Sequence, residues 1–445
     1  MNSFKTPIAR RKFLQTSGIA GLASAVGLEA RAAPLSAPGS RGPAFVADKY
    51  TIITRTPPNR DMGQGEPEIY YMAMSMVKMP GGRLVAATPR GRRDPLKGLE
   101  AMIISVSDDA GLTWRNVAEL PYDSGEPVLY VHEGRLYQFL SPNRPESERR
   151  TSFPREGNGR IWATVSDDEG ITWSKPVAVI SGLPKYTSGG QTALVVQHGR
   201  LYWTISERYQ TLAVVCCQLD RGILNPAAWR ISDLVEMPIP PEVVWGKYDD
   251  GSTMRCLEGN VVEVGGRLLV VARAVINRYA TANLAALFEI IDDPETGRLR
   301  LEFLQLYPVP GAQCKFYIER DPVAGLYWMA SNLPTNSHDL IQIGRKPGAG
   351  RALQHREKWG VREDRRLLTL WYSLDALNWI PAGWIAKADG WDQSFMYPVI
   401  LIDGNDILVI SRTARDSGNY HDVDLATFHR IREFRNLAVN LLPTF

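Results

Sequence analysis

The chain has 445 residues, of which 22% are charged, and a formal net charge of +3. Its lysines and arginines are spread out without a basic block, which argues against a nucleic-acid-binding protein, and no apolar run reaches the roughly 18 residues of a membrane-spanning helix. This length usually means two or three domains, although closed all-β architectures can be as long in one domain.

The N-terminus has the layout of an export signal. Arg10 and Arg11 precede a weakly apolar stretch over residues 18–28, and an A-x-A-like cleavage site follows. The paired arginines resemble a twin-arginine signal, which implies a bacterial protein carried in the folded state by the twin-arginine export machinery to the periplasm or beyond. We expect a signal peptide at 1–33, a flexible leader at 34–48 and the folded domain at 49–445.

Four cysteines are present, and their spacing predicts neither a metal site nor a disulfide framework. None of them forms a CxxC pair, and no Asp, His or Cys cluster has the spacing of metal ligands. We therefore expect buried thiols and a protein without a metal or an organic cofactor. The four residues are Cys216, Cys217, Cys256 and Cys314.

Six times along the chain, a β-rich run is followed by a turn containing glycine and then by a short apolar run. This order predicts a hairpin of two neighbouring strands. The distance between successive hairpins leaves room for a four-stranded unit and its loops. The glycine-led runs are 82–87, 134–137, 199–203, 266–271, 325–328 and 404–410.

The pattern S-x-D-x-G-x-T-W occurs at 107–114 and 166–173, and a shortened variant occurs at 373–379. Asp and Gly can form a tight turn, the serine hydroxyl and the carboxylate can accept its backbone N–H groups, and the tryptophan can pack beneath it. The full copies follow the first two hairpins, so we expect them to join the third and fourth strands of a sheet. They predict architecture and no chemistry.

Six repeated units, each unable to bury its apolar surface alone, predict an all-β fold, a six-bladed β-propeller. The polar insertion at 347–364 predicts a surface loop. Residues 425–437 predict either a short helix or the strand that closes the ring.

Six blades with S-x-D-x-G-x-T-W turns resemble the sialidase superfamily, also called the Asp-box or BNR-repeat propellers, and the chain is similar to a divergent environmental-bacterial branch of it. In that family three arginines hold the substrate carboxylate, a glutamate activates a nucleophilic tyrosine, and an aspartate donates a proton. A permanently charged sugar needs fixed cationic groups, and a tyrosine with a pKa of about 10 needs a neighbouring base to attack near neutral pH.

The resemblance places four of these roles on the chain. Glu258 matches the activating glutamate and Arg273 the second arginine, and a hairpin would bring the two together at one rim. Arg365 matches the third arginine, with Arg366 as its rival, and Tyr397 matches the nucleophile. The alternatives are a solvent-facing pair of charges for Glu258 and Arg273, and a core tyrosine for Tyr397.

The proton donor is expected on the loop after the first hairpin. Asp94 is the best-placed candidate there, and Glu100 is the second. A general acid needs a raised pKa, whereas nearby arginines lower it, so a plain salt bridge is the alternative role for Asp94.

The first arginine of the family is missing, because Met72 stands in its place. The glutamate that supports this arginine is also replaced, and the corresponding strand ends at Arg412. One hypothesis is that Arg412 supplies the missing cation and completes a clamp with Arg273 and Arg365. The other hypothesis is that the substrate is a different acidic or neutral glycan.

Tyr420 and His421 are adjacent, and such a pair is what a uronate lyase uses to move protons; alternatively, His421 is simply hydrogen-bonded to a neighbouring aspartate. The resemblance implies an exported, exo-acting glycoside hydrolase that removes a terminal acidic sugar such as sialic acid. A propeller polysaccharide lyase acting on a uronate-containing glycan and a non-catalytic glycan-binding propeller are the alternatives. In each case the partner is a glycan and not a nucleic acid or a membrane, and the oligomeric state is open.

Overall fold

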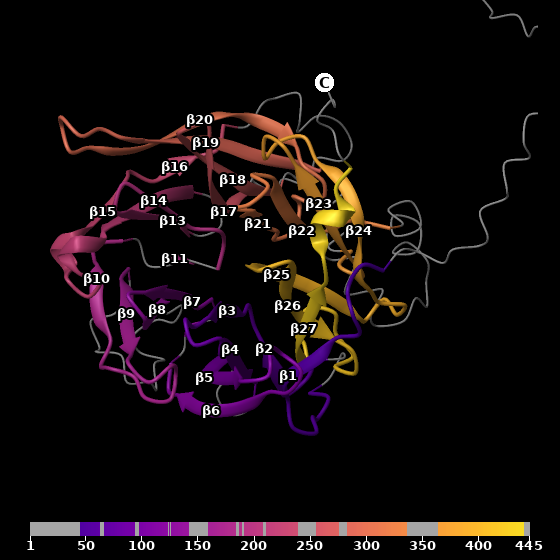
Figure 1. Ribbon diagram of the computed structural model, residues 1–445. Coiled ribbons are helices and arrows are strands. Elements are labelled where there is room, and N and C mark those ends of the chain that lie inside the picture. The colour runs from indigo at the N-terminus through magenta and orange to yellow at the C-terminus, as the bar shows by residue number, and fades with distance from the viewer. Residues whose placement is uncertain are drawn as a thin grey trace, which may run out of the picture. The chain divides into compact units, whose positions relative to one another are not determined.

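Six antiparallel sheets surround a common axis in the computed structural model (Figure 1). Apart from short 3-10 turns, the regular elements of the described residues are strands. The fold is therefore a six-bladed β-propeller, as the repeated hairpins predict. The structure describes residues 45–62, 66–93, 98–122, 124, 126–141, 159–183, 187–188, 191–207, 211–238, 255–275, 283–335 and 364–439.

The first three blades contain the strands up to residue 236. Blade 1 consists of β2 (Ile69–Tyr71), β3 (Ser75–Lys78), β4 (Leu84–Arg92), β5 (Gly98–Ser107) and β6 (Arg115–Leu120). Blade 2 consists of β7 (Val128–His132), β8 (Arg135–Leu140), β9 (Ile161–Ser166) and β10 (Val177–Ile180). Blade 3 consists of β11 (Thr187–Ser188), β12 (Val195–Gln197), β13 (Arg200–Glu207), β14 (Thr211–Gln218), β15 (Trp229–Ile231) and β16 (Val235–Glu236).

The last three blades complete the ring. Blade 4 consists of β17 (Arg255–Val264), β18 (Arg267–Val275), β19 (Leu284–Asp292) and β20 (Leu299–Pro308). Blade 5 consists of β21 (Tyr317–Arg320), β22 (Tyr327–Asn332), β23 (Leu367–Ser373) and β24 (Ile380–Lys387). Blade 6 consists of β25 (Ser394–Asp403), β26 (Asp406–Ala414), β27 (Leu425–Ile431) and, from the other end of the described chain, β1 (Thr51–Arg55).

The ring is closed in blade 6. Strand β1 pairs with β27, and Thr51 lies opposite Phe428. The stretch predicted as a short helix or a closing strand contains both kinds of element, since β27 is followed by a 3-10 turn at Phe434–Leu437. The insertion predicted as a surface loop is 347–364, and its residues 347–363 lie outside the part of the chain that the structure describes.

All six predicted hairpins are present, and their glycine-led runs become the second strands β4, β8, β13, β18, β22 and β26. The repeated turn also forms where it was expected, between the third and fourth strands of blades 1, 2 and 5. In the first copy, Ser107 Oγ accepts the Gly111 N–H at 2.8 Å, Asp109 Oδ1 accepts the Thr113 N–H at 2.9 Å, and Trp114 Nε1 donates to the Gly111 carbonyl at 3.2 Å.

The hydrophobic core lies mainly between neighbouring blades and is not one central mass. Separate clusters join blades 1 and 2, 2 and 3, 3 and 4, and 4 and 5, and a larger one spans blades 5, 6 and 1. All four cysteines are buried and free, as expected. Because the sheets stack face to face, their first strands are left to line the axis.

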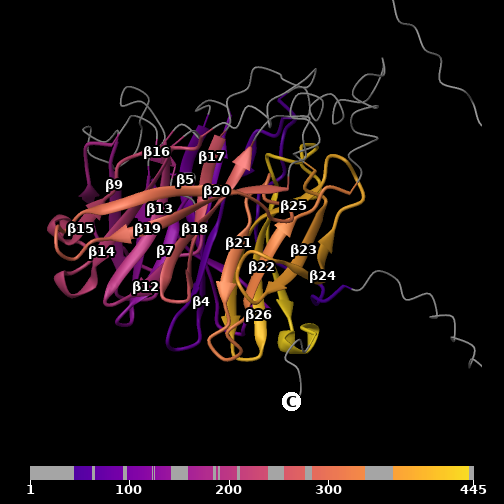
Figure 2. The same cartoon turned by 90° about the horizontal axis from the view of Figure 1, so that it is seen from above.

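These first strands bring distant parts of the chain together. β17 contacts β21, β21 contacts β25, and β25 contacts β3 (Figures 1 and 2). Every blade begins at the axis and alternates direction outwards, so the first strands run in the same sense. Residues near their starts therefore gather at one end of the axis, and residues near their ends gather at the other.

Candidate active site

Glu258 and Tyr397 occupy equivalent places near the starts of β17 and β25. Both have a backbone φ of +54°, in the left-handed region, and both lie in β-bulges, where the pairing shifts between Leu257 and Asn260 and between Met396 and Val399. This conformation costs free energy for a residue with a Cβ atom, and such outliers gather at functional sites. The two bulges point to a site at this end of the axis.

The bulge at Glu258 is held against its neighbours by a glycine. A Cβ atom on Gly259 would lie 2.6 Å from Val270 Cγ1 and 3.0 Å from Thr204 Oγ1 of blade 3. Thr204 Oγ1 also donates a hydrogen bond to the Gly259 carbonyl at 2.6 Å. The close approach between two blades therefore fixes the direction in which Glu258 leaves its strand.

Glu258 and Arg273 form a buried ion pair, as their positions on one hairpin predict. Arg273 Nη1 lies 3.0 Å from Glu258 Oε2, and Arg273 Nε donates to the Gln313 carbonyl at 2.8 Å. The two side chains are 7% and 2% exposed, so water competes little for this pair. The alternative of a solvent-facing pair is wrong.

Two further guanidinium groups flank the Tyr397 ring. The Cζ atom of Arg365 lies 5.2 Å from the ring centroid, and that of Arg412 lies 5.3 Å away. Arg412 reaches this place because it pairs with Met396 across β25 and β26, and Arg365 Nη1 contacts Met396 Sδ at 2.8 Å. Both arginines are almost fully buried, whereas Tyr397 is partly exposed and forms the accessible face of the group.

The rival arginine, Arg366, has a different environment. It lies 3.0 Å from an Asp364 carboxylate oxygen, and its guanidinium lies 3.4 Å from the centre of the Trp391 ring. The charge of Arg366 is therefore balanced by contacts outside the candidate site. Of the two neighbours, Arg365 is the one that faces Tyr397.

Arg412 lies beside Met72, the residue that stands in place of the family's first arginine. Arg412 Nη2 contacts Met72 Sδ at 3.3 Å, and Arg412 Nε donates to the Tyr71 carbonyl at 3.1 Å. Its Nη1 atom has no hydrogen-bond partner among the described residues. A cation from a strand of blade 6 thus lies beside Met72 of blade 1.

Lys315, just ahead of β21, is part of this group, although the sequence did not predict a role for it. Its Nζ atom donates to the Pro398 carbonyl at 3.1 Å and lies 5.9 Å from the centroid of the Tyr397 ring. Burial lowers its pKa to about 8, and the carboxylates of Glu258 and Glu126 oppose that shift. No pattern in the sequence distinguishes this lysine from the others.

Some of the charges around Tyr397 raise the pKa of its phenol group and others lower it. Burial is the largest effect, and together with the Glu258 carboxylate it raises the Tyr397 pKa to about 12. The positive charges of Arg365, Arg273 and Arg412 act in the opposite direction and lower this pKa. The phenol is therefore protonated near neutral pH and needs a base to become a nucleophile. The Glu258 carboxylate is thus close enough to the phenol to influence its pKa.

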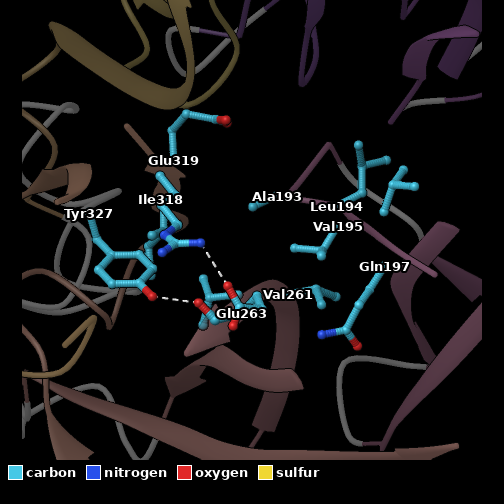
Figure 3. Close-up of a pocket in the computed structure, with 12 residues that line it drawn as sticks. Ala193, Leu194, Val195, Gln197, Val261, Glu263, Ile318, Glu319 and Tyr327 are labelled. Carbon is cyan, nitrogen blue, oxygen red and sulfur yellow. Dashed lines mark hydrogen bonds and ion pairs between the residues drawn. The ribbon is translucent and has the colours of Figure 1, made fainter. Parts of the chain in front are cut away.

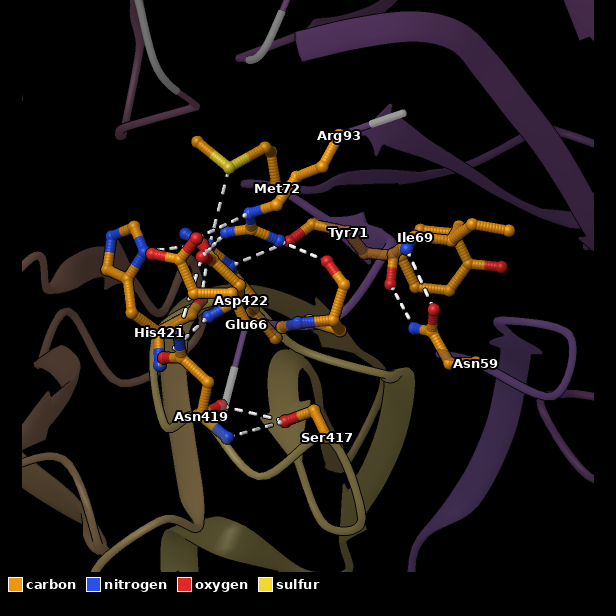
Figure 4. A network of polar contacts seen from close by, with 12 residues as sticks. Asn59, Glu66, Ile69, Tyr71, Met72, Arg93, Ser417, Asn419, His421 and Asp422 are labelled. Atoms are coloured by element: carbon orange, nitrogen blue, oxygen red, sulfur yellow. Dashed lines mark hydrogen bonds and ion pairs between the residues drawn. The ribbon is translucent and has the colours of Figure 1, made fainter. Parts of the chain in front are cut away.

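Asp422 lies at the centre of a polar network at the edge of this group (Figure 4). It accepts a hydrogen bond from Arg93 Nη2, and its Oδ1 atom lies 2.8 Å from His421 Nδ1 and 3.8 Å from Arg412 Nη2. Arg93 Nε in turn lies 3.3 Å from a Glu66 oxygen. The predicted alternative for His421, a hydrogen bond to a neighbouring aspartate, is present.

Tyr420 and His421 are not equally accessible, although they are adjacent in sequence. Tyr420 is 2% exposed, whereas the His421 side chain is 38% exposed. The Tyr420 carbonyl accepts a hydrogen bond from Ser394 Oγ at 2.6 Å, which ties this segment to β25. The two side chains therefore do not present a joint surface to a ligand.

Glu100, the second candidate for the proton donor, lies in a network of salt bridges. It lies 2.7 Å from Arg90 Nε and 3.0 Å from Arg92 Nε, and Arg90 also pairs with Glu119 at 2.5 Å. This network makes Glu100 a salt-bridge residue on the face of blade 1. Asp94 lies outside the described residues.

A separate cavity of about 410 Å³ lies at the other end of the first strands (Figure 3). Residues from β12, the later part of β17 and β21 line it, and they include Glu319 and the ion pair between Glu263 and Arg320 at 2.7 Å. Among the described residues there is no group of three or more His, Cys, Asp or Glu that could hold a metal ion. No helix among the residues that the structure describes is long and apolar enough to cross a membrane.

Comparison with known proteins gives the fold a context. No protein-family model and no curated protein matches the sequence. Among solved structures, the chain is similar to Trypanosoma rangeli sialidase in complex with sialic acid, with a TM-score of 0.52 and 16% identity over 83% of this chain and 55% of that one. It is also similar to a Penicillium chrysogenum alpha-L-arabinanase complexed with arabinobiose, with a TM-score of 0.50 and 15% identity over 87% of this chain and 98% of that one.

A third similar structure is a protein of unknown function from Dyadobacter fermentans, with a TM-score of 0.51 and 15% identity over 87% of this chain and 98% of that one. The chain thus spans little more than half the length of the sialidase it matches. At these identities the likeness establishes the fold. The chain has the six-bladed propeller fold found in sialidases and in this arabinanase, which are glycoside hydrolase propellers.

Proposed function

We propose that the chain is an exo-acting glycoside hydrolase that removes a terminal acidic sugar, with Tyr397 as nucleophile and Glu258 as its base. The observation that carries the proposal is the convergence, at one end of the axis, of a partly exposed phenol, a buried carboxylate and four cationic side chains from three blades. These four are Arg273, Arg365, Arg412 and Lys315.

The chemistry follows from the protonated state of Tyr397. As the phenol oxygen attacks the anomeric carbon, Glu258 accepts its proton, and the electron pair of the breaking C–O bond passes to the leaving group. Water then displaces the tyrosine from the covalent intermediate, and Glu258 returns the proton. Two displacements at one carbon retain the anomeric configuration.

The cations favour a substrate with a carboxylate. The Cζ atoms of Arg365 and Arg412 lie 5.2 Å and 5.3 Å from the centroid of the Tyr397 ring, and Arg412 Nη1 has no hydrogen-bond partner among the described residues. A fixed positive field of this kind stabilises an anionic sugar next to the nucleophile. The similar sialidase was solved with sialic acid, so sialosides are the first substrates to test.

The alternatives receive less support. A lyase acting through Tyr420 and His421 needs both side chains at the substrate, and Tyr420 is buried. A non-catalytic binding propeller gives no reason for two strained bulges at the positions of Glu258 and Tyr397. We also propose that the protein acts outside the cytoplasm after export as a folded chain, on the basis of Arg10 and Arg11.

The test is hydrolysis of fluorogenic glycosides. The wild-type protein is assayed on 4-methylumbelliferyl glycosides of N-acetylneuraminic acid, glucuronic acid and arabinofuranose, with product configuration read by NMR. We expect turnover of an acidic glycoside with retention, and a loss of roughly 10²-fold or more in kcat for Tyr397→Phe and Glu258→Gln. Tyr307→Phe, which alters an exposed hydroxyl bonded to Asn378, is the matched control.

A second pair of variants tests whether Arg365 or Arg366 contributes to the site. Arg365→Gln should raise KM for the acidic glycoside or lower kcat, whereas Arg366→Gln should change neither by more than a few-fold. Absence of turnover on every glycoside, or full activity of Tyr397→Phe, would contradict the proposal. An unsaturated uronate product, detected by its ultraviolet absorbance, would favour the lyase instead.

A further inference from the structure

The imidazole of His421 is held in one orientation by a carboxylate. His421 Nδ1 lies 2.8 Å from Asp422 Oδ1, and Asp422 is itself bound by Arg93 Nη2 and by Asn419 Nδ2 at 3.5 Å (Figure 4). The charged partners His421, Arg412 and Arg93 hold the Asp422 pKa well below its usual range, so this carboxylate stays ionised. An ionised acceptor fixes the proton on Nδ1 and directs Nε2 away from Asp422.

The backbone of His421 is tied to the candidate site. Its carbonyl accepts a hydrogen bond from Arg412 Nη2, and its N–H donates to Asn419 Oδ1 at 2.8 Å. The positive charges of Arg412 and Arg365 both act on the imidazole, and both guanidinium groups lie within 5.3 Å of the Tyr397 ring centroid. The partly exposed imidazole therefore lies at the edge of the same group of charges as the nucleophile.

We propose that His421, oriented by Asp422, is the general acid and base that serves Tyr397. This role rests on the proposed function, because it requires a leaving group to protonate. The geometry is that of an acid–histidine pair, in which the carboxylate selects the tautomer and the other ring nitrogen exchanges protons with the substrate. It needs no aspartate from the loop after the first hairpin.

The proton balance is complete with these residues. In the first step protonated His421 gives its Nε2 proton to the departing oxygen, while Tyr397 bonds to the anomeric carbon and Glu258 holds the phenol proton. In the second step neutral His421 takes a proton from water, whose oxygen attacks the anomeric carbon as the bond to Tyr397 breaks, and Glu258 returns its proton to the Tyr397 oxygen. The sugar gains a hydroxyl, and all three side chains return to their starting states.

The pH dependence follows from the groups that face the imidazole. Burial, Arg412 from β26 and Arg365 ahead of β23 lower the His421 pKa, and Asp422 from the same loop opposes them, while Arg93 acts through Asp422. The donor form of His421 exists only below this lowered pKa. We therefore expect kcat/KM for substrates with a poor leaving group to fall as pH rises through a value below the usual 6.5 of histidine.

The experiment compares leaving groups on one acidic sugar. His421→Ala and His421→Gln are assayed on the 4-nitrophenyl and the methyl glycoside, because nitrophenolate leaves without a proton and methoxide does not. We expect kcat/KM to fall roughly 10²-fold or more on the methyl glycoside and much less on the nitrophenyl glycoside. We also expect the fall in kcat/KM above the histidine pKa to be absent from the pH profile of the variants. His198→Asn, an exposed turn histidine with φ of +49°, is the control.

The outcomes are distinct. Wild-type protein that hydrolyses none of the glycosides overturns the proposed function and this role with it. Wild-type activity with equal losses on both leaving groups, or none, overturns only the role of His421. If thermal unfolding shows that both His421 variants are destabilised, the wild-type profile decides: an alkaline limb on the methyl glycoside and not on the nitrophenyl glycoside supports the role, and identical profiles overturn it.

Discussion

Glu319 lies on β21 at the end of the axis remote from Tyr397, and its environment opposes its charge. The side chain is half-buried beside the cavity of about 410 Å³, and burial raises its pKa to about 8. A carboxyl group in this state keeps its proton at neutral pH in the folded protein but not in the unfolded chain. The two ends of the axis thus differ, since one collects cations around a phenol and the other contains a protonated acid.

This difference predicts a pH-dependent stability. The unfolded chain releases the Glu319 proton near pH 4.5, whereas the folded protein retains it up to about pH 8, so the free energy of unfolding falls as pH rises between these values, by at most about 1.4 kcal/mol per pH unit. Glu319→Gln should remove this slope, measured by urea unfolding at pH 5, 6, 7 and 8. Glu295→Gln, in an exposed turn, should keep it, and equal slopes in both variants would contradict the prediction.

At the scale of elements, the repeated turns join blades as well as strands. Gly111 in the turn of blade 1 has φ of +89°, and a Cβ atom there would lie 2.3 Å from the Phe428 ring on β27 of blade 6. Trp114 of the same turn lies 5.6 Å from that ring, measured between centroids. The glycine is therefore required both by its backbone conformation and by the closeness of the next blade.

Two glycine variants separate these requirements. Gly134 has φ of +76° with nothing within 4 Å of a Cβ atom, so Gly134→Ala should cost about 1 kcal/mol from its backbone alone. Gly111→Ala carries the same backbone cost and must also displace Phe428, which should add roughly 1–3 kcal/mol. Chemical unfolding of both variants measures the difference, and equal losses would show that the contact between blades 1 and 6 has little energetic weight.

At the scale of the whole molecule, the ring closes through the two ends of the described chain. β1 forms the outer strand of blade 6 by pairing with β27, so the sixth blade is complete only when the last strand has been made. The fold therefore cannot be completed until both ends of the described chain are available to pair.

Export can be tested with the two arginines alone. In a bacterial host with twin-arginine export, the wild-type chain should be recovered from the periplasm or the medium without its first 33 or so residues. A variant with Arg10→Lys and Arg11→Lys should stay in the cytoplasm, folded and uncleaved, as shown by fractionation and N-terminal sequencing. Lys5→Arg is the charge-conserving control outside the pair, and export of the double variant would disprove the assignment.

Local patterns in the sequence determined most of the fold. The hairpins and the repeated turns were predicted correctly, because a glycine turn between apolar runs and a serine and aspartate that accept backbone N–H groups act within about ten residues. Glu258 and Arg273 were paired for the same reason, since one hairpin contains both. The resemblance carried by these turns then selected Arg365 and Tyr397 as residues to examine.

Only the tertiary structure decided which side chains meet. The sequence left Arg365 and Arg366 as rivals, and the salt bridge to Asp364 separates them. It contained no signal that Lys315 would lie over the Tyr397 ring or that Arg93 of blade 1 would bind Asp422 of blade 6. Contacts between residues of different blades exist because closing the ring brings together segments that are far apart in the chain.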